Sequence, residues 1–385
     1  MRCIYLDYAA STPVDPEVLR AMEPYFTKEF GNPGSLHSFG QKAMTAVDAA
    51  REEVAGFIGA KFREIIFTAS ATEANNISVG GVVTWFKMKT RKNARVIISA
   101  IEHESVMETA KSLEKWGDEV IYLPVDKGGV VDLGDLKNKL NENTALVSVM
   151  YANNEIGTVQ PIENIAKIVS EAKKTNPNIL FHTDAAQAFQ FFDCNVEKLG
   201  VDLMTLSGQK IYGPKGVGVL YARDGTKMNP IIQGGGQEFG MRSGTENVPA
   251  IAGFASAAKL ARDLRQKEAQ RLCELLDWFW GEIKKSYPWA EINGLEDKSK
   301  KLPNILNIYF PGHSAQDILT RFDLAGLAVS SGSACRSRAV ESSYVIKALS
   351  YGEDRAKSSV RFSLGRATDK AELEEALKII KSCLN

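Results

Sequence analysis

The feature that most constrains this chain is an alternation of short β-branched runs with amphipathic helical stretches, from about residue 64 to 245. This alternation is typical of α/β proteins with a mostly parallel sheet, because parallel neighbours need a crossover connection. Between two of the runs, apolar residues recur at helical spacing over 162–172, as expected of a helix that covers one face of the sheet. The predicted strands include residues 64–68, 95–99, 119–124, 145–151, 179–183 and 216–221.

The pattern changes after Asn247, where a long amphipathic stretch leads into mixed strands and helices. A chain of 385 residues is long enough for about two to three domains. We therefore predict a large domain over 15–260 and a smaller C-terminal domain over 261–385. We expect the N-terminal segment, residues 1–14, to pack with the small domain.

Composition excludes several classes of protein. The 47 basic and 47 acidic residues leave no net charge, so we expect no direct nucleic-acid binding through a basic patch. No charge-free stretch reaches the roughly 18 apolar residues of a membrane helix. Asp7 lies where a secretory signal would need an apolar core, so we expect a cytoplasmic location. The five cysteines form no CxxC pair, which argues against a disulfide framework or a structural zinc site.

Glycine-rich stretches do not indicate a nucleotide site. Gly213–Gly218 and Gly234–Gly236 have neither the spacing of a P-loop nor the position of a dinucleotide fingerprint. By contrast, Phe67–Asn76 places small hydroxyl residues after a strand and at the start of a helix. Backbone N–H groups there could hold a phosphate, although an ordinary helix cap is the alternative for this motif taken alone.

Two further strand ends carry an acid and an amine. Asp184 follows one apolar run, and Lys210 comes soon after Ser207 at the end of the next. An open α/β sheet binds its ligand at the carboxyl ends of its strands, so these groups could share one crevice with the helix start. The combination suits pyridoxal 5'-phosphate: a lysine forms a Schiff base, a carboxylate keeps the pyridine nitrogen protonated, and the helix start holds the phosphate.

Ten ordered motifs extend over essentially the whole chain, and their order is more specific than any one of them. They are Tyr5–Ala10, Gly31–Pro33, Ala71–Glu73, Glu102–His103, Asn153–Gly157, Asp184–Gln187, Lys210–Gly216, Arg242–Thr245, Ser330–Cys335 and Val360–Gly365. Together they resemble the cysteine desulfurases of the aminotransferase class V family, in the NifS/IscS-like group with a short active-site cysteine loop. The resemblance implies a fold type I pyridoxal-phosphate enzyme, with a mostly parallel seven-stranded sheet in a large cofactor-binding domain and a smaller α+β domain that carries the cysteine loop.

The resemblance also implies a role for individual residues. Lys210 would form the Schiff base, His103 would stack on the cofactor ring and carry protons, and Cys335 would be the nucleophile. Arg361 and Asn154 would bind the substrate, and Thr245 would reach the cofactor from the other subunit of a homodimer. The residues expected around the cofactor are Ala71, Thr72, His103, Asn154, Asp184, Gln187, Ser207, Gln209, Lys210 and Thr245.

The implied reaction converts L-cysteine to L-alanine and leaves the sulfur on Cys335 as a persulfide. Small polar neighbours and the charges of Arg336 and Arg338 would favour the Cys335 thiolate. Sulfur acceptors in this family include iron–sulfur assembly scaffolds and tRNA-thiolation enzymes. Two alternatives stay open: a relative that acts on selenocysteine or cysteine sulfinate, and a catalytically reduced homologue that keeps the fold to bind a scaffold.

Three positions depart from the usual pattern of the family. Gln209 replaces a histidine before the lysine, Ser70 replaces a glycine beside the cofactor, and Phe239 replaces an arginine before the Arg242–Thr245 motif. An amide still donates a hydrogen bond but carries no charge. We therefore expect any change in cofactor binding to arise on the phosphate side and not at Lys210.

Overall fold

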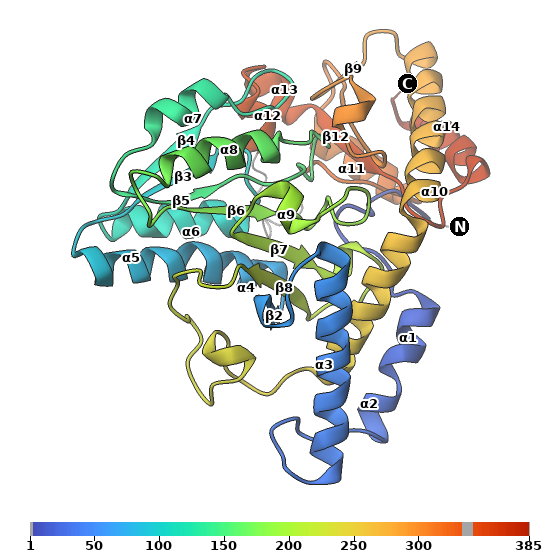
Figure 1. Ribbon diagram of the computed structural model, residues 1–385. Helices are drawn as coiled ribbons and strands as arrows, with labels where there is room; N and C mark the ends of the chain where they lie inside the picture. Colours follow the sequence, from blue (N-terminus) through green and yellow to red (C-terminus); the bar gives the residue numbers. More distant parts are fainter. Residues whose placement is uncertain (1–2, 333–341, 385) are drawn as a thin grey trace.

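The computed structural model describes residues 3–332 and 342–384. Its largest sheet has seven strands in the order β2-β8-β7-β6-β5-β3-β4 (Figure 1). Neighbouring strands are parallel except at β8, which runs antiparallel to β2 and β7. The predicted α/β fold with a mostly parallel sheet is therefore confirmed. The strands are β2 (Ile65–Thr68), β3 (Arg95–Ser99), β4 (Glu119–Leu123), β5 (Thr144–Ser148), β6 (Leu180–Asp184), β7 (Leu203–Ser207) and β8 (Gly218–Ala222).

Helices cover both faces of this sheet, and alternate strand residues face them. On β3, Ile97 packs in the cluster that includes Ile165 of α8, whereas Ile98 packs in the cluster that includes Val106 of α6. Both residues are fully buried, which explains why the strands read as continuous apolar runs. Figure 1 shows α4 (Ala71–Asn76), α5 (Val82–Thr90) and α6 (Glu104–Lys115) on one side, and α7 (Leu133–Lys139), α8 (Ile162–Ala172) and α9 (Val196–Leu199) on the other.

Long helices connect the sheet to the C-terminal region. Helix α10 (Val248–Ser286) packs against α1 (Pro16–Met22) and α3 (Ser38–Ile58), while the short α2 (Pro24–Thr27) lies between these two in sequence. The long amphipathic stretch expected after Asn247 is this helix. Because α10 crosses residue 260 without interruption, the division into domains at that point stays a prediction.

The C-terminal region forms a second, antiparallel sheet in the order β12-β10-β9. A short parallel pair joins β1 (Ile4–Tyr5) to β11 (Leu327–Ala328), so the N-terminal segment lies against this region. The other elements are β9 (Glu291–Ile292), β10 (Ile305–Tyr309), β12 (Ser359–Ser363), α11 (Ala315–Leu324), α12 (Tyr344–Ala348), α13 (Glu353–Lys357) and α14 (Lys370–Leu384). Short turns complete the chain: η1 (Phe62–Glu64), η2 (Ile77–Gly81), η3 (Gly208–Lys210), η4 (Glu238–Gly240) and η5 (Lys298–Lys300).

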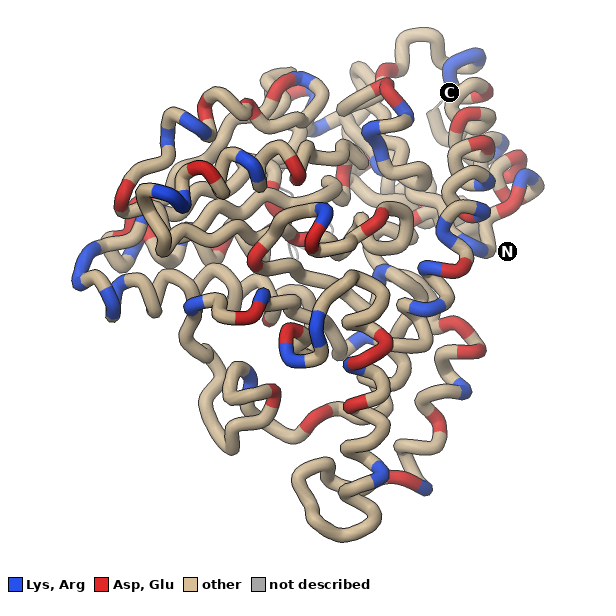
Figure 2. The backbone as a smooth tube through the Cα atoms, viewed as in Figure 1, with Lys and Arg blue, Asp and Glu red and all other residues tan. Residues whose placement is uncertain are grey.

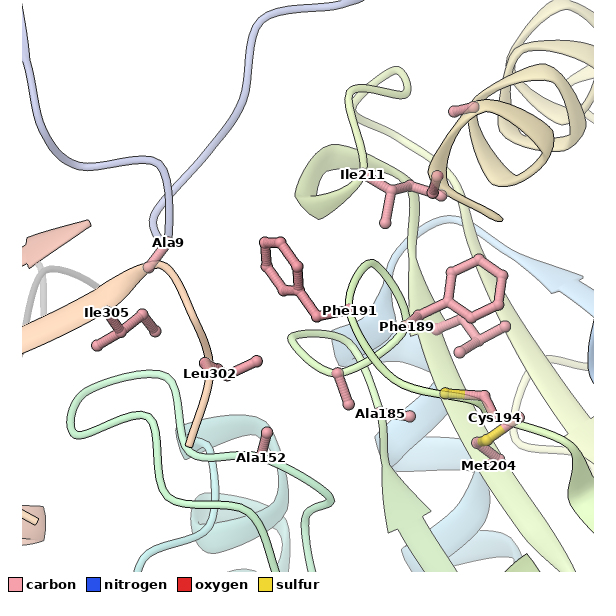
Figure 3. Close-up of a cluster of buried hydrophobic side chains, with 14 of the residues drawn as sticks. Ala9, Ala152, Ala185, Phe189, Phe191, Cys194, Met204, Ile211, Leu302 and Ile305 are labelled. Carbon is pink, nitrogen blue, oxygen red and sulfur yellow. The ribbon is translucent and has the colours of Figure 1, made fainter. Parts of the chain in front are cut away.

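Charged side chains of both signs are interspersed along the chain (Figure 2). Among the described helices, none combines the length and apolar character needed to cross a bilayer. The core extends from the sheet to a neighbouring loop, where Cys194 lies close to Met204 of β7 among apolar residues (Figure 3). Burial raises the pKa of the Cys194 thiol to about 12, which favours the uncharged thiol and is typical of a cysteine that packs in a core.

Candidate active site

A cavity of about 160 Å³ lies at the carboxyl ends of the central strands. It brings together nearly every site residue expected from the sequence. The lining consists of Ala9, Ala10, Ser70, Ala71, Thr72, His103, Met150, Ala152, Asn154, Asp184, Ala186, Gln187, Ser207, Gln209, Lys210, Gly332 and Arg361. Two expected residues are missing: Thr245 is not part of this lining, and Cys335 lies outside the described residues.

The helix start at Ala71 forms one end of the cavity. Ser70 is the N-cap of α4, and its hydroxyl accepts a hydrogen bond from Glu73 N at 3.1 Å. In the described chain, no hydrogen-bond acceptor takes the N–H groups of Ala71 and Thr72, which suits them to an anion. Ser70, which replaces the usual glycine, therefore caps the helix without occupying these two donors.

Strand β8 approaches this helix start closely through a glycine. A Cβ atom added at Gly218 would lie 2.5 Å from the backbone carbon of Ser70 and 2.7 Å from Ala71 N. Only glycine leaves room for such a backbone approach without displacing the helix start. Sequence reasoning did not single out Gly218, although it lies within a glycine-rich stretch that we noted for another reason.

Asp184, the last residue of β6, presents a fixed carboxylate to the cavity. It is 5% exposed, and its two oxygens accept hydrogen bonds from Asn75 Nδ2 at 2.7 Å and Ala186 N at 2.9 Å. Charge-assisted hydrogen bonds of this kind hold the carboxylate in one orientation. The supporting role of Asn75 was not expected from the sequence, where it appeared only as part of the helix start.

His103 is the N-cap of α6, and its ring nitrogens have different roles. Nδ1 accepts a hydrogen bond from Ser105 N at 3.1 Å and lies 2.8 Å from Ser105 Oγ. Burial is the main cause that lowers the pKa of His103, and the Asp184 carboxylate opposes this shift. We infer from the Nδ1 contact that the neutral ring carries its proton on Nε2.

Behind the cavity lie two further buried titratable groups. Burial lowers the pKa of His182 to about 4, and its ring contacts the hydroxyls of Ser148 at 2.8 Å and Thr205 at 3.1 Å. Burial also raises the pKa of Glu102 to about 8, although its Oε1 accepts hydrogen bonds from Ser99 and Met150 N. Both side chains are therefore uncharged at neutral pH.

Lys210 lies in η3, just after β7. Its Nζ donates hydrogen bonds to Ala9 O at 2.8 Å and Ala10 O at 2.7 Å. The Gln187 amide also donates to Ala9 O, at 2.9 Å. The N-terminal segment thus forms a wall of the cavity, a role that we had not assigned to the Tyr5–Ala10 motif.

Arg361 reaches the cavity from β12, and its side chain is 2% exposed. Its Nη2 forms an ion pair with Asp7 Oδ1 at 2.6 Å, and its Nη1 donates to Asn154 O at 2.9 Å. Its Nε is buried, and no partner for it lies in the described part of the chain. Asp7 as the partner of Arg361 was not expected, since the two residues are 354 positions apart.

Residues on either side of positions 333–341 lie against motifs of the cavity. Ser343 Oγ donates a hydrogen bond to Glu155 Oε2 at 2.6 Å, and Tyr344 OH donates to Glu102 O at 2.5 Å. Gly332, which has a φ of 91°, faces the same Glu155 carboxylate, and a Cβ atom there would lie 2.3 Å from Oε2. Glu155 therefore bonds to the C-terminal side of the segment that contains the expected nucleophile and lies close to the backbone on its N-terminal side.

Three other sequence expectations concern the phosphate side. Gln209 lines the cavity, and its carbonyl accepts hydrogen bonds from Thr12 N and Thr12 Oγ1 at 3.1 and 3.0 Å. Phe239 lies away from the cavity, with Arg51 4.9 Å above its ring. Thr245 is exposed on the loop before α10, so its contact with a partner subunit stays a prediction.

The donor set of this cavity fits pyridoxal phosphate. Two N–H groups at a helix start suit the phosphate, the Asp184 carboxylate suits a protonated ring nitrogen, and the Lys210 amine suits an aldehyde. The His103 ring lines the same cavity, where burial lowers its pKa and smaller effects come from the Asp184 carboxylate, which raises it, and the Lys210 amine, which lowers it. Among the described residues, no group of histidine, cysteine or acidic side chains is arranged to hold a metal ion.

Comparisons with known proteins agree with this fit. The aminotransferase class-V family matches residues 4–376. The cysteine desulfurase IscS of Dictyoglomus turgidum is 46% identical over 380 residues, covering 99% of this chain and 94% of that protein. A mitosomal cysteine desulfurase of Trachipleistophora hominis is 44% identical over 380 residues, covering 97% and 84%.

Solved structures give the same result. A NifS-like protein superposes with a TM-score of 0.91 at 36% identity, covering 99% of both chains. The structure of SspA in complex with cysteine superposes with a TM-score of 0.80 at 35% identity, covering 94% of this chain and 98% of that one. The family match extends over nearly all of the chain, the relatives are more than 40% identical, and the fold is shared. The chain therefore belongs to the aminotransferase class-V family, among its NifS/IscS-like cysteine desulfurases.

Proposed function

We propose that this protein takes sulfur from L-cysteine, releases L-alanine and carries the sulfur on Cys335 as a persulfide. The observation that carries the proposal is the convergence of Lys210, Asp184, His103 and Arg361 on one cavity. The similar SspA structure contains cysteine, which supports the same substrate here. The curated relatives, which are named cysteine desulfurases, support the same reaction.

The cofactor of this reaction is pyridoxal phosphate in our proposal. When bound, it would accept the electron pair that is released as the Cα proton leaves the substrate. Asp184 would hold the proton of the ring nitrogen, and the N–H groups of Ala71 and Thr72 would hold the phosphate. Lys210 Nζ would take up the Cα proton and deliver it again, because its amine lines the same cavity as Asp184, His103 and Arg361.

Arg361 would bind the substrate carboxylate. Its guanidinium is held by Asp7 and Asn154 O, so it is oriented before substrate arrives. The Nε–H, which has no partner among residues 3–332 and 342–384, forms with Nη2 a two-pronged edge that matches a carboxylate. This preorganisation would place the substrate Cα near Lys210 and restrict the substrate to α-amino acids.

The sulfur step balances without an added oxidant or reductant. The Cys335 thiolate attacks the substrate sulfur, so that an S–S bond forms while the Cβ–S bond breaks. The electron pair of the broken bond stays with Cβ, which takes a proton and becomes the methyl group of alanine. Sulfur is thereby oxidised to the persulfide level and Cβ is reduced.

The test uses the purified holoenzyme with L-cysteine and no reductant. We expect about one alanine and one persulfide per subunit in the first turnover. Cys335→Ser should keep the visible absorbance of the bound cofactor and form no persulfide, whereas the control Cys273→Ser should behave as wild type. Persulfide on Cys335→Ser would overturn the assignment. Faster turnover of selenocysteine or cysteine sulfinate would favour the alternative substrates, and a colourless protein that cannot be reconstituted would favour a scaffold-binding role.

We also propose a homodimer and a protein acceptor for the sulfur. Large apolar side chains are exposed near α2 and at the start of α3: Phe26 is 57%, Phe30 65% and Leu36 92% exposed. An exposed apolar patch of this kind is typical of an interface, and Thr245 would then be free to reach the partner subunit. Light scattering gives the mass in solution, and a mass of one subunit would contradict the dimer.

The acceptor, an iron–sulfur scaffold or a tRNA-thiolation enzyme, is identified by sulfur transfer from the persulfide form.

A further inference from the structure

A second cavity, of about 590 Å³, lies in the C-terminal region and shares no lining residue with the active-site cavity. It opens between the C-terminal half of α10, strand β9, the segment 294–303 and α13. Apolar and aromatic side chains form much of its wall, namely Leu276, Trp280, Leu295 and Leu306. This is the size and lining typical of a site for a small organic molecule.

The charges around this cavity are mostly neutralised by one another. Lys298 pairs with Asp277 at 2.6 Å, and Arg355 pairs with Glu291. Lys284 uses its ammonium to donate to Pro288 O and Ala290 O, both at 2.7 Å. These contacts account for three of the four basic side chains in the lining, and leave Lys301.

Lys301 is the exception, because it is 9% exposed and its ammonium has no hydrogen bond or ion pair with any described residue. Burial lowers the pKa of Lys301 to about 8, while the more distant carboxylates of Glu296 and Asp277 oppose the shift. The ammonium opens onto the cavity from a residue that is otherwise largely removed from water, and an anion in the cavity would offset the cost of holding this charge without a counter-ion.

The position of Lys301 is fixed by the backbone beneath it. Its stem packs over Gly157, where an added Cβ atom would lie 3.2 Å from Lys301 Cγ. The next residue, Leu302, donates its N–H to Gly157 O at 2.8 Å. Since the stem and the backbone are both held, the ammonium is presented to the cavity at a defined place and is not a mobile surface group.

We propose that this cavity binds a small organic monoanion, a carboxylate on an apolar or aromatic body, with Lys301 as its counter-ion. The single unpaired ammonium favours one negative charge over two, since Asp277, Glu291 and Glu296 also line the cavity and would repel a dianion. The apolar wall favours an organic body over a bare inorganic ion. The proposal does not depend on the desulfurase reaction.

Benzoate is the probe, and benzyl alcohol is its uncharged counterpart. We expect calorimetry with the holoenzyme at pH 7 to detect benzoate and to give at least about tenfold weaker binding of benzyl alcohol. Lys301→Met keeps an apolar stem over Gly157 and should weaken benzoate by at least about tenfold, with Lys301→Gln as a second variant. Lys298→Met is the matched control, because Lys298 lines the same cavity but is exposed and paired, and it should bind benzoate as wild type does.

The pH dependence gives a separate measurement. A carboxylate stays ionised between pH 7 and 9.5, whereas Lys301 loses its proton above about 8, so benzoate affinity should fall over this range. The other charged and titratable groups in the lining are Cys273, Asp277, Lys284, Glu291, Glu296, Lys298, Tyr351 and Arg355, and burial raises the pKa of the Cys273 thiol. The proposal is overturned if wild type does not bind benzoate, if benzyl alcohol binds equally well, or if a Lys301 variant whose melting temperature is retained binds benzoate unchanged.

Discussion

Removing the charge of Asp7 from its ion pair with Arg361 should lower the stability of the protein and strengthen the binding of a carboxylate ligand. Asp7→Asn keeps an oxygen acceptor for Arg361 but removes the negative charge. Two unit charges about 4 Å apart attract by about 4 kcal/mol at an effective dielectric constant of about 20. Removing one partner of a buried pair costs about 3–5 kcal/mol, and Asp7 is 17% exposed, so we expect a loss near the lower value, about 3 kcal/mol.

A substrate carboxylate would replace the missing charge. In the wild-type protein that carboxylate must bind an arginine that Asp7 already neutralises, whereas in Asp7→Asn it meets an unbalanced guanidinium. L-alanine, the proposed product, should therefore bind Asp7→Asn at least about tenfold more tightly than wild type. Ligand binding to the native state raises the melting temperature, so L-alanine should restore much of the lost stability.

The assay is thermal unfolding of both holoenzymes over a series of L-alanine concentrations. L-alaninol, which lacks the carboxylate, is the control ligand and should stabilise both proteins equally. Asp15→Asn is the control variant, because Asp15 forms a similar pair with Arg366 at 3.2 Å but does not line the cavity. If L-alanine stabilises Asp7→Asn no more than wild type, Arg361 is not the carboxylate site or Asp7 does not compete for it.

Two further predictions concern a buried acid and a close backbone contact. Burial raises the pKa of Glu102 to about 8, from about 4.3 in an unfolded chain. The protonated side chain therefore contributes its full stability to the fold below about pH 4, and this stability is lost as the pH rises to about 8. Glu102→Gln, which stays neutral, should gain in melting temperature over wild type between pH 5 and 8; a constant difference across that range would refute a protonated Glu102. In Gly218→Ala, the added Cβ clashes with Ser70 and should displace the start of α4, which weakens cofactor binding by about 5- to 150-fold. Cofactor release on dilution measures this loss. Gly56→Ala is the control, because an added Cβ there meets no atom within 4 Å, and it should bind the cofactor as wild type does. Equal retention of the cofactor by both alanine variants would contradict the proposed role of the β8 approach.

The sequence predicted the fold well because its strongest signal is local. Buried runs such as 95–99 and 179–183 lie within one residue of strands β3 and β6, since parallel strands covered on both faces must be apolar throughout. The order of the strands and the antiparallel placement of β8 are not local properties. Residues such as Val219 read like those of any other buried strand, and only the assembled sheet shows their direction.

The candidate site was predicted where a motif carried it and missed where a contact joins distant segments. Asp184 ends one strand and Lys210 comes just after the next, so both could be placed at one edge of the sheet from the sequence. The pairing of Asp7 with Arg361 could not, because nothing local to either residue indicates the other. Glu155 belongs to a motif that we recognised, but its contact with Ser343 depends on how the C-terminal region folds back on the sheet.

Strand β1 and Asp7 are translated well before the segments that they contact, which affects when these contacts can form during synthesis. Strand β1 finds its partner only at Leu327 and Ala328, and Asp7 finds Arg361 later still. As the ribosome works from the N-terminus, these opening residues leave the exit tunnel long before the segments that they join have been translated. The wall of the candidate active-site cavity that Asp7 and Arg361 form together is therefore completed only after Arg361 has been translated, 354 residues after Asp7, and a nascent chain arrested before that point would lack this ion pair.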